Sequence, residues 1–137
     1  MYDPMLFRDR ERPAQVVIGG VIPAIFGAVA GVLVGVSSGS YWGWAVLVSI
    51  GGIVAGFEHL DGWGGADRGL IAGFIYGVAL LLMHAIVGTH AKVSLGSHPI
   101  FLPIVTAIIG MFLSAFGGWS ARVLRERTNA RAEPPVS

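Results

Sequence analysis

Four long apolar stretches dominate the pattern of hydrophobic and polar positions along the chain. Charged residues gather at the two ends and in one short segment between the second and third stretches. Because a membrane-spanning helix needs about 20 mostly apolar residues, each stretch predicts one such helix. The predicted helices cover residues 16–36, 41–59, 67–89 and 99–121.

The composition supports a lipid environment for these helices. The 137 residues are 54% hydrophobic and 12% charged, whereas soluble domains carry about 25% charged residues. We therefore predict an all-α, polytopic membrane protein with a four-helix transmembrane bundle over residues 16–121. The first stretch is longer than the apolar part of a signal peptide, so we expect it to be retained. Residues 1–15 precede the bundle, and the basic, proline-terminated segment 122–137 is predicted to be disordered.

The basic residues predict the orientation of the bundle. Of the nine, only Lys92 falls outside the two ends and the middle loop. By the positive-inside rule, both termini and the middle loop are therefore expected in the cytoplasm, with the helices in the inner or plasma membrane. The eight residues on the predicted cytoplasmic side are Arg8, Arg10, Arg12, Arg68, Arg122, Arg125, Arg127 and Arg131.

Small residues at four-residue spacing mark one face of every predicted helix. Lipid tails are as apolar as leucine, so helices in a membrane associate through close packing, which small residues permit. We therefore predict glycine-zipper packing, and expect Pro23 to kink the first helix. The predicted packing residues are Gly27, Gly31, Gly35, Gly52, Gly56, Gly69, Gly73, Gly77, Gly110, Ser114 and Gly118.

His84 is an ionisable residue inside a predicted span, and such residues are functional candidates. Seven residues separate it from Gly77, so both share one helix face and His84 is expected to point into a helix contact. One interpretation is a packing residue that hydrogen-bonds across the interface. The other is a residue that accepts a proton or contacts a solute along a pathway.

A second group of candidates surrounds the predicted middle loop. His59 shares a face with Gly56 and is expected to point inward, Asp67 is expected to cap the third helix, and Arg68 is expected to pair with Glu58 or Asp61. The candidates form either an ion-paired turn, a cation-attracting pore mouth or a docking loop; they are Glu58, His59, Asp61, Asp67 and Arg68. Their spacing matches no metal-binding motif, so no metal is predicted.

The sequence leaves two function classes open. The first is a small homo-oligomeric channel or transporter for a small solute or ion, with His84 on the pathway and the loop carboxylates at its mouth. The alternative is a non-catalytic accessory or scaffold subunit that docks on a membrane protein through glycine-rich faces. The chain has no cysteine and a net charge of +1, so we expect no thiol chemistry and no nucleic-acid partner. We also expect no cofactor and no enzymatic activity.

Overall fold

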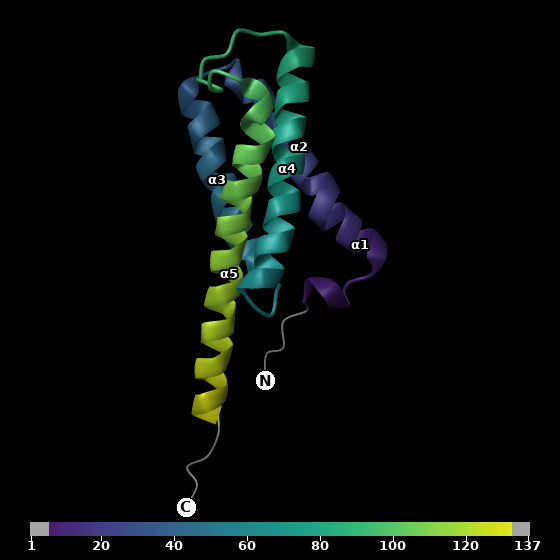
Figure 1. Cartoon of the computed structure of the whole chain (residues 1–137), viewed down its shortest axis with the longest axis vertical. Helices are drawn as coiled ribbons and strands as arrows, with labels where there is room; N and C mark the ends of the chain where they lie inside the picture. The colour runs from purple at the N-terminus through teal and green to yellow at the C-terminus, as the bar shows by residue number, and fades with distance from the viewer. Residues whose placement is uncertain (1–5, 133–137) are drawn as a thin grey trace, which may run out of the picture.

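The computed structural model describes residues 6–132, and this part of the chain is built from helices (Figure 1). The first rod joins α1 (Arg12–Val16), the π-helical segment η2 (Val17–Val21) and α2 (Ile22–Val34). It is followed by α3 (Ser38–Gly56), α4 (Gly62–Val87) and α5 (Leu102–Ala132), with short 3-10 turns at Phe7–Asp9 (η1) and Pro99–Phe101 (η3). Four helices are long and apolar enough to cross a membrane, as the sequence predicts.

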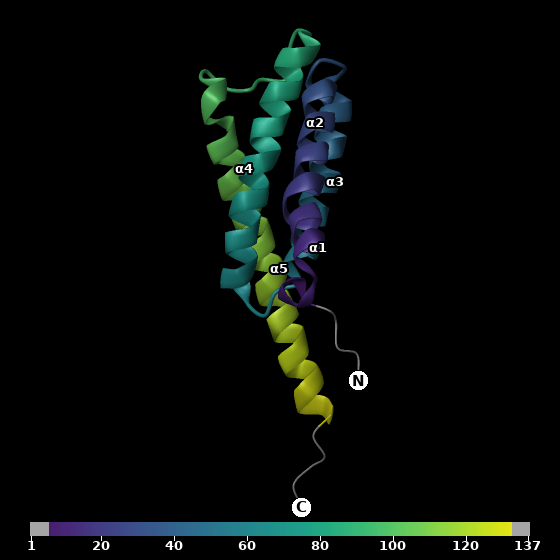
Figure 2. The ribbon, with the colours of Figure 1, turned by 90° about the vertical axis from the view of Figure 1, so that its right-hand side faces the viewer.

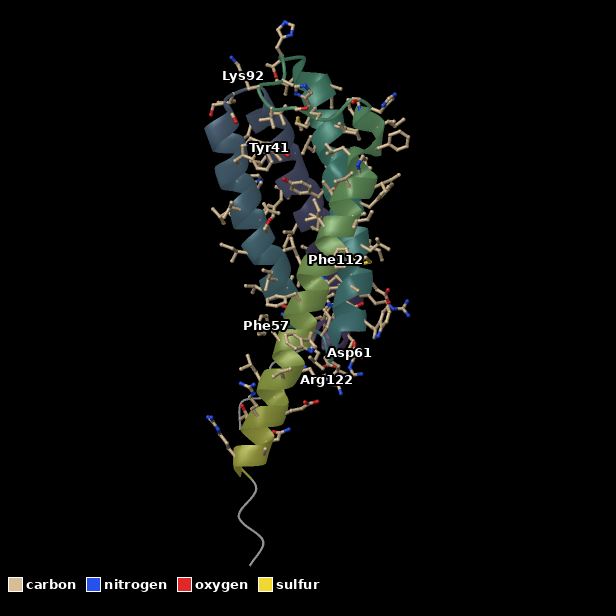
Figure 3. All side chains as sticks on the ribbon, turned by 60° about the vertical axis from the view of Figure 1, so that its left-hand side comes forward. Tyr41, Phe57, Asp61, Lys92, Phe112 and Arg122 are labelled. Carbon is tan, nitrogen blue, oxygen red and sulfur yellow. The ribbon has the colours of Figure 1, made fainter. Side chains whose placement is uncertain are left out.

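The start of α1 and the end of α5 lie at the same end of the bundle (Figure 1). We call it the basic end; it also holds the α3–α4 turn, residues 57–61. Figure 3 shows Phe57, Asp61 and Arg122 toward this end, and Tyr41 and Lys92 at the opposite end. Large apolar side chains such as Val46, Leu47 and Phe112 are exposed on the outside of the bundle. An outer surface of this kind suits lipid rather than water.

The helices α4 and α5 form the most closely packed pair. A Cβ atom built at Gly69 would overlap the Gly110 carbonyl, and one at Gly73 would overlap the Thr106 carbonyl. A Cβ at Gly77 would overlap the Thr106 hydroxyl and the backbone of Pro103, at the start of α5. The two backbones can approach this closely because both helices present small residues along the contact.

The other two helices pack on this pair, α2 on α4 and α3 on α5, and they also contact each other where Trp44 donates to the Phe26 carbonyl. In α2, Gly27 lies against the Tyr76 carbonyl and Gly31 against the Leu80 carbonyl, both in α4. In α3, Gly56 lies against the Ser114 carbonyl of α5, whereas Gly52 makes only ordinary contact with Leu113. The remaining predicted small residues also lie at contacts: Gly35 faces Thr89, and Gly118 faces the Asp61 carbonyl.

The helix α4 begins five residues earlier than predicted, because Asp61 and not Asp67 is its N-cap. The Asp61 carboxylate accepts a hydrogen bond from the Gly64 amide at 2.9 Å, which satisfies one of the free amides of the first turn. Asp67 lies in the second turn, where the helix already supplies backbone partners. At the other end, Gly88 stops α4 in a left-handed conformation at φ 68°, and its amide donates to the His84 carbonyl.

The helix α5 continues to Ala132, eleven residues beyond the predicted end at Ala121, so the expectation of disorder is wrong for residues 122–132. Figure 2 shows this part of α5 extending past the other helices. We call residues 122–132 the α5 extension. It contains good helix formers and an Arg122–Glu126 ion pair of 2.9 Å at the helical i,i+4 spacing. Residues 133–137 of the predicted tail lie outside the described part of the chain.

Candidate functional site

The α3–α4 turn is the point where side chains from four parts of the chain meet. The guanidinium of Arg10 donates to Glu58 Oε1 at 2.8 Å, and this ion pair is about three-quarters buried, with 28% and 27% of the two side chains exposed. The Phe7 amide donates to the Glu58 carbonyl at 3.0 Å. The N-terminal segment is therefore fastened to the turn by both its backbone and a charged side chain.

Arg125 of α5 holds the same turn from the other side. Its two terminal nitrogens donate to the carbonyls of Phe57, at 2.8 Å, and His59, at 2.9 Å. Carbonyls just beyond the C-terminal end of a helix lack intrahelical partners and carry partial negative charge. Arg125 satisfies both groups and thereby fixes the end of α3 to α5.

Arg68 is the third arginine at the turn, and its position depends on Pro23. In η2 the Ile22 amide donates to the Val17 carbonyl, five residues back. The same π spacing would pair the Ile18 carbonyl with residue 23, but proline has no N–H. Arg68 supplies the missing donor at 3.4 Å. Pro23 was expected to kink the helix, and the structure places a π-helical segment directly before it.

The remaining bonds of Arg68 run to α3 and to Phe7. Its other terminal nitrogen donates to the Ala55 carbonyl at 2.9 Å, and the guanidinium carbon lies 4.7 Å from the centre of the Phe7 ring. This distance is typical of a cation–π contact. Arg68 therefore joins the first, second and third spans. It does not pair with Glu58 or Asp61 as the sequence led us to expect, because Glu58 is bonded to Arg10 and Asp61 caps α4.

His59 lies beneath the N-terminal segment. Its ring is stacked at 5.6 Å from Phe7, and its Nε2 atom is buried with no hydrogen-bond partner in the described part of the chain. Burial lowers the pKa of His59 below its ordinary value, and the positive charge of Arg68 lowers it further, against smaller opposing effects of Glu58 and Asp61. The imidazole is therefore neutral at pH 7 and acts as a packing partner rather than a cation.

His84 is remote from this cluster. It lies in the last turn of α4 at the opposite end, where its backbone nitrogen is close to Gly31 of α2. Its Nδ1 atom is buried and finds no partner among residues 6–132. The structure thus brings Glu58, His59, Asp61 and Arg68 together at the basic end and separates His84 from them.

A groove of about 680 Å³ opens beside this cluster, between the first rod and α4. Its floor includes Gly19 and Gly20, and the ring of Phe7 lies 3.4 Å from a Cβ built at Gly19. Asp67, exposed on α4, lies at its edge. The lining residues are Phe7, Arg12, Gln15, Val16, Gly19, Gly20, His59, Gly64, Asp67, Arg68, Ile71 and Ile75.

Sequence reasoning did not find Phe7, Arg10 or Arg125 as members of this cluster. From the sequence, the two arginines were used only to predict orientation, as part of the uneven distribution of basic residues. Within residues 6–132, no group of three or more histidine, cysteine or acidic side chains is placed to hold a metal ion. The bonds that hold the cluster run from the guanidinium groups of Arg68 and Arg125 to backbone carbonyls and from Arg10 to the Glu58 carboxylate.

Comparison of the chain with protein-family models, with curated proteins and with solved structures gives no match. A function for this protein must therefore be argued from its own geometry.

Proposed function

We propose that this protein is a non-catalytic accessory subunit of a larger membrane complex, with its basic end in the cytoplasm and the α5 extension as its docking element. The observation that carries the proposal is the α5 extension itself. Residues 122–132 continue a transmembrane helix for about 16 Å at 1.5 Å per residue. They hold Leu124, Arg127 and Arg131 exposed.

Within the described residues, the α5 extension lacks packing partners along its exposed face, and short helices without tertiary packing are marginal in water. A partner that covers its apolar and basic face would stabilise it. The extension carries four arginines and one glutamate, so the complementary surface is an acidic protein surface with an apolar patch for Leu124. Arg125 links the extension to the α3–α4 turn. A partner bound to the extension would therefore be connected to the bundle through this contact.

The interior of the bundle supports a subunit that does not transport. Apart from His84, several polar side chains within the spans bond to the chain's own backbone: Ser114 to the Gly52 carbonyl at 3.0 Å, and Trp44 to the Phe26 carbonyl at 3.0 Å. Thr106 likewise bonds to the Leu102 carbonyl at 3.0 Å. Groups bonded in this way are not free to line a water-filled path. In this proposal the glycine faces act as a zipper within the chain, so docking falls to the extension.

Site-specific photo-crosslinking in native membranes tests the proposal. A photoreactive residue in place of Arg127 should capture one defined protein, and the same residue in place of the lipid-facing Phe112 should capture lipid only. The double variant Arg127→Glu, Arg131→Glu should lower co-purification of that protein without loss of the bundle. A gently extracted complex whose native mass contains only copies of this chain would refute the accessory function.

A homo-oligomeric channel or transporter is the second candidate, and the observation that favours it is the buried Nδ1 of His84, which has no hydrogen-bond partner among residues 6–132. A second copy or a solute would supply the missing partner. In that case His84→Ala changes flux in liposomes while the oligomer number stays constant. Unchanged flux would remove His84 from any pathway.

A further inference from the structure

In the groove at the basic end, the polar lining residues lie near the starts of the helices and the apolar ones lie farther along them. One wall runs from Arg12 to Gly20 and the other from Asp67 to Ile75, each about 12 Å long at 1.5 Å per residue. The charged and polar lining residues lie where these walls begin, and Val16, Ile71 and Ile75 follow farther along the helices. A polar mouth that leads into an apolar trough matches an amphipathic ligand with a charged head and a hydrocarbon chain.

Two adjacent glycines make room for the hydrocarbon chain. Gly20 has no atom within 4 Å of a built Cβ, and the Cβ of Gly19 would touch only the Phe7 ring. The trough therefore exists because side chains are absent from this face of η2. With the apolar walls, this space suits an acyl chain that enters sideways from the bilayer.

The charge at the mouth favours an anion. Arg12 is exposed and forms no ion pair in the described part of the chain, and Arg68 is bonded only to backbone carbonyls and to the Phe7 ring. Asp67 is the one acidic residue in the lining. Two guanidinium groups against one carboxylate leave a positive mouth, and His59 is neutral. Gln15 already donates to the Arg10 carbonyl, so Arg12 is the group free to bind.

We propose that this groove binds one anionic phospholipid, with its phosphate on Arg12, the charge of Arg68 behind it, and an acyl chain over Val16, Gly20 and Ile71. Basic pockets between membrane helices are known places for anionic lipid headgroups. With the basic end in the cytoplasm, as proposed above, the bound lipid belongs to the inner leaflet. Binding of the lipid does not require a protein partner.

Native mass spectrometry of the full chain in detergent tests the lipid site. The protein is titrated with phosphatidylglycerol, with phosphatidylcholine and with soluble glycerol phosphate. We expect one tightly retained phosphatidylglycerol, with weaker retention of the other two. Equal retention of the two lipids overturns the proposal, and retention of glycerol phosphate as tight as that of phosphatidylglycerol shows a phosphate site without a lipid.

Two variants with matched controls locate the bound lipid. Gly20→Leu fills the trough, and Gly43→Leu adds the same side chain at a glycine on α3 that likewise has no atom within 4 Å of its Cβ. Gly20→Leu should lower retention of phosphatidylglycerol to that of phosphatidylcholine, and Gly43→Leu should leave it unchanged.

Arg12→Gln should weaken phosphatidylglycerol binding about fivefold, and Arg127→Gln, which removes the same charge from the α5 extension, should not. Because Arg12 is exposed, this variant tests the proposal even if Gly20→Leu fails to fold. Wild-type binding in both Gly20→Leu and Arg12→Gln overturns it. Both variants measure lipid retention and not binding of a protein partner. A negative result for the lipid site therefore leaves the accessory function untouched.

Discussion

The helices α4 and α3 are both rich in glycine, yet they use it differently. In α4, Gly65, Gly69 and Gly73 each lie so close to the α5 backbone that a Cβ there would overlap a carbonyl. In α3, Gly39 and Gly43 have nothing within 4 Å of a built Cβ. Glycine at four-residue spacing permits close approach, but α3 approaches a neighbour this closely only toward its basic end, where Gly56 lies against the Ser114 carbonyl.

The helix α3 is held by a close glycine contact at Gly56 and by polar contacts, most of them at its basic end. Arg68 bonds to the Ala55 carbonyl, Arg125 to the Phe57 and His59 carbonyls, and Ser114 to the Gly52 carbonyl. The bundle therefore combines a pair of helices joined by packing with a third joined both by packing at Gly56 and by side chains that bind backbone carbonyls. Mutations should distinguish the contribution of close helix packing from that of side-chain bonds to backbone carbonyls.

The largest effect is expected from filling the α4–α5 contact. Gly69→Leu places a side chain where the Gly110 carbonyl lies, and overpacking of this kind should cost about 3 kcal/mol or more. Gly43→Leu on α3 should be nearly neutral. Unfolding in detergent by titration with a denaturing detergent measures both variants, and equal midpoints for the two would show that the α4–α5 contact is not close.

Removing the arginine that holds α3 to α5 should have the next largest effect. Arg125→Ala leaves the Phe57 and His59 carbonyls without their charged donor, which should cost about 2 kcal/mol. Hydrogen exchange should rise at residues 57–61 before it rises in α4. Arg127→Ala, two positions along the same helix, is the control, and a loss of the same size in both variants would argue against the carbonyl contacts.

A smaller loss should follow from Ser114→Ala. The hydroxyl donates across the helix contact to Gly52, and such bonds within membrane proteins contribute about 0.6 kcal/mol. Ser49 donates to the Ala45 carbonyl of its own helix, so Ser49→Ala should leave the stability almost unchanged. The difference between the two variants in the same unfolding assay isolates the interhelical bond. No difference would mean that this bond does not help to hold α3.

The smallest effect, and the only gain, is expected at an open glycine of α3. Gly51 has nothing within 4 Å of a built Cβ, and replacing a mid-helix glycine with alanine is worth about 0.5 kcal/mol. Gly51→Ala should therefore raise the unfolding midpoint slightly, whereas Gly73→Ala, at the α4–α5 contact, should lower it. A loss in Gly51→Ala would reveal a partner for this face of α3.

The sequence was sufficient to predict the four helices because the length of an apolar stretch is a direct measure of membrane span. It was insufficient at the helix ends. Asp61 and Asp67 both lie near the start of the third apolar stretch, and only the path of the chain decides which carboxylate reaches a free amide. The α5 extension was missed because its charged composition resembles that of a disordered tail, although no proline interrupts it before residue 134.

The arginine contacts of the candidate site were beyond prediction for a different reason. Arg125 binds the carbonyl of a residue 66 positions earlier, and nothing in the local pattern specifies a backbone oxygen as a partner. Pro23 offered the one usable signal, since a proline within a span leaves a carbonyl without its amide and a polar side chain must satisfy it. A search for such donors would have pointed to Arg68.

The Ile18 carbonyl left free by Pro23 also implies an order of assembly. Chains are made from the N-terminus onward, so the Ile18 and Ala55 carbonyls are synthesised before Arg68, which binds both. Both acceptors of Arg68 are therefore already part of the chain when Arg68 is added. Arg125, which comes last, closes the turn after all four helices have been made. Arg68 and Arg125 thus each bind carbonyls that are synthesised before them, whereas Arg10 is made before its partner Glu58.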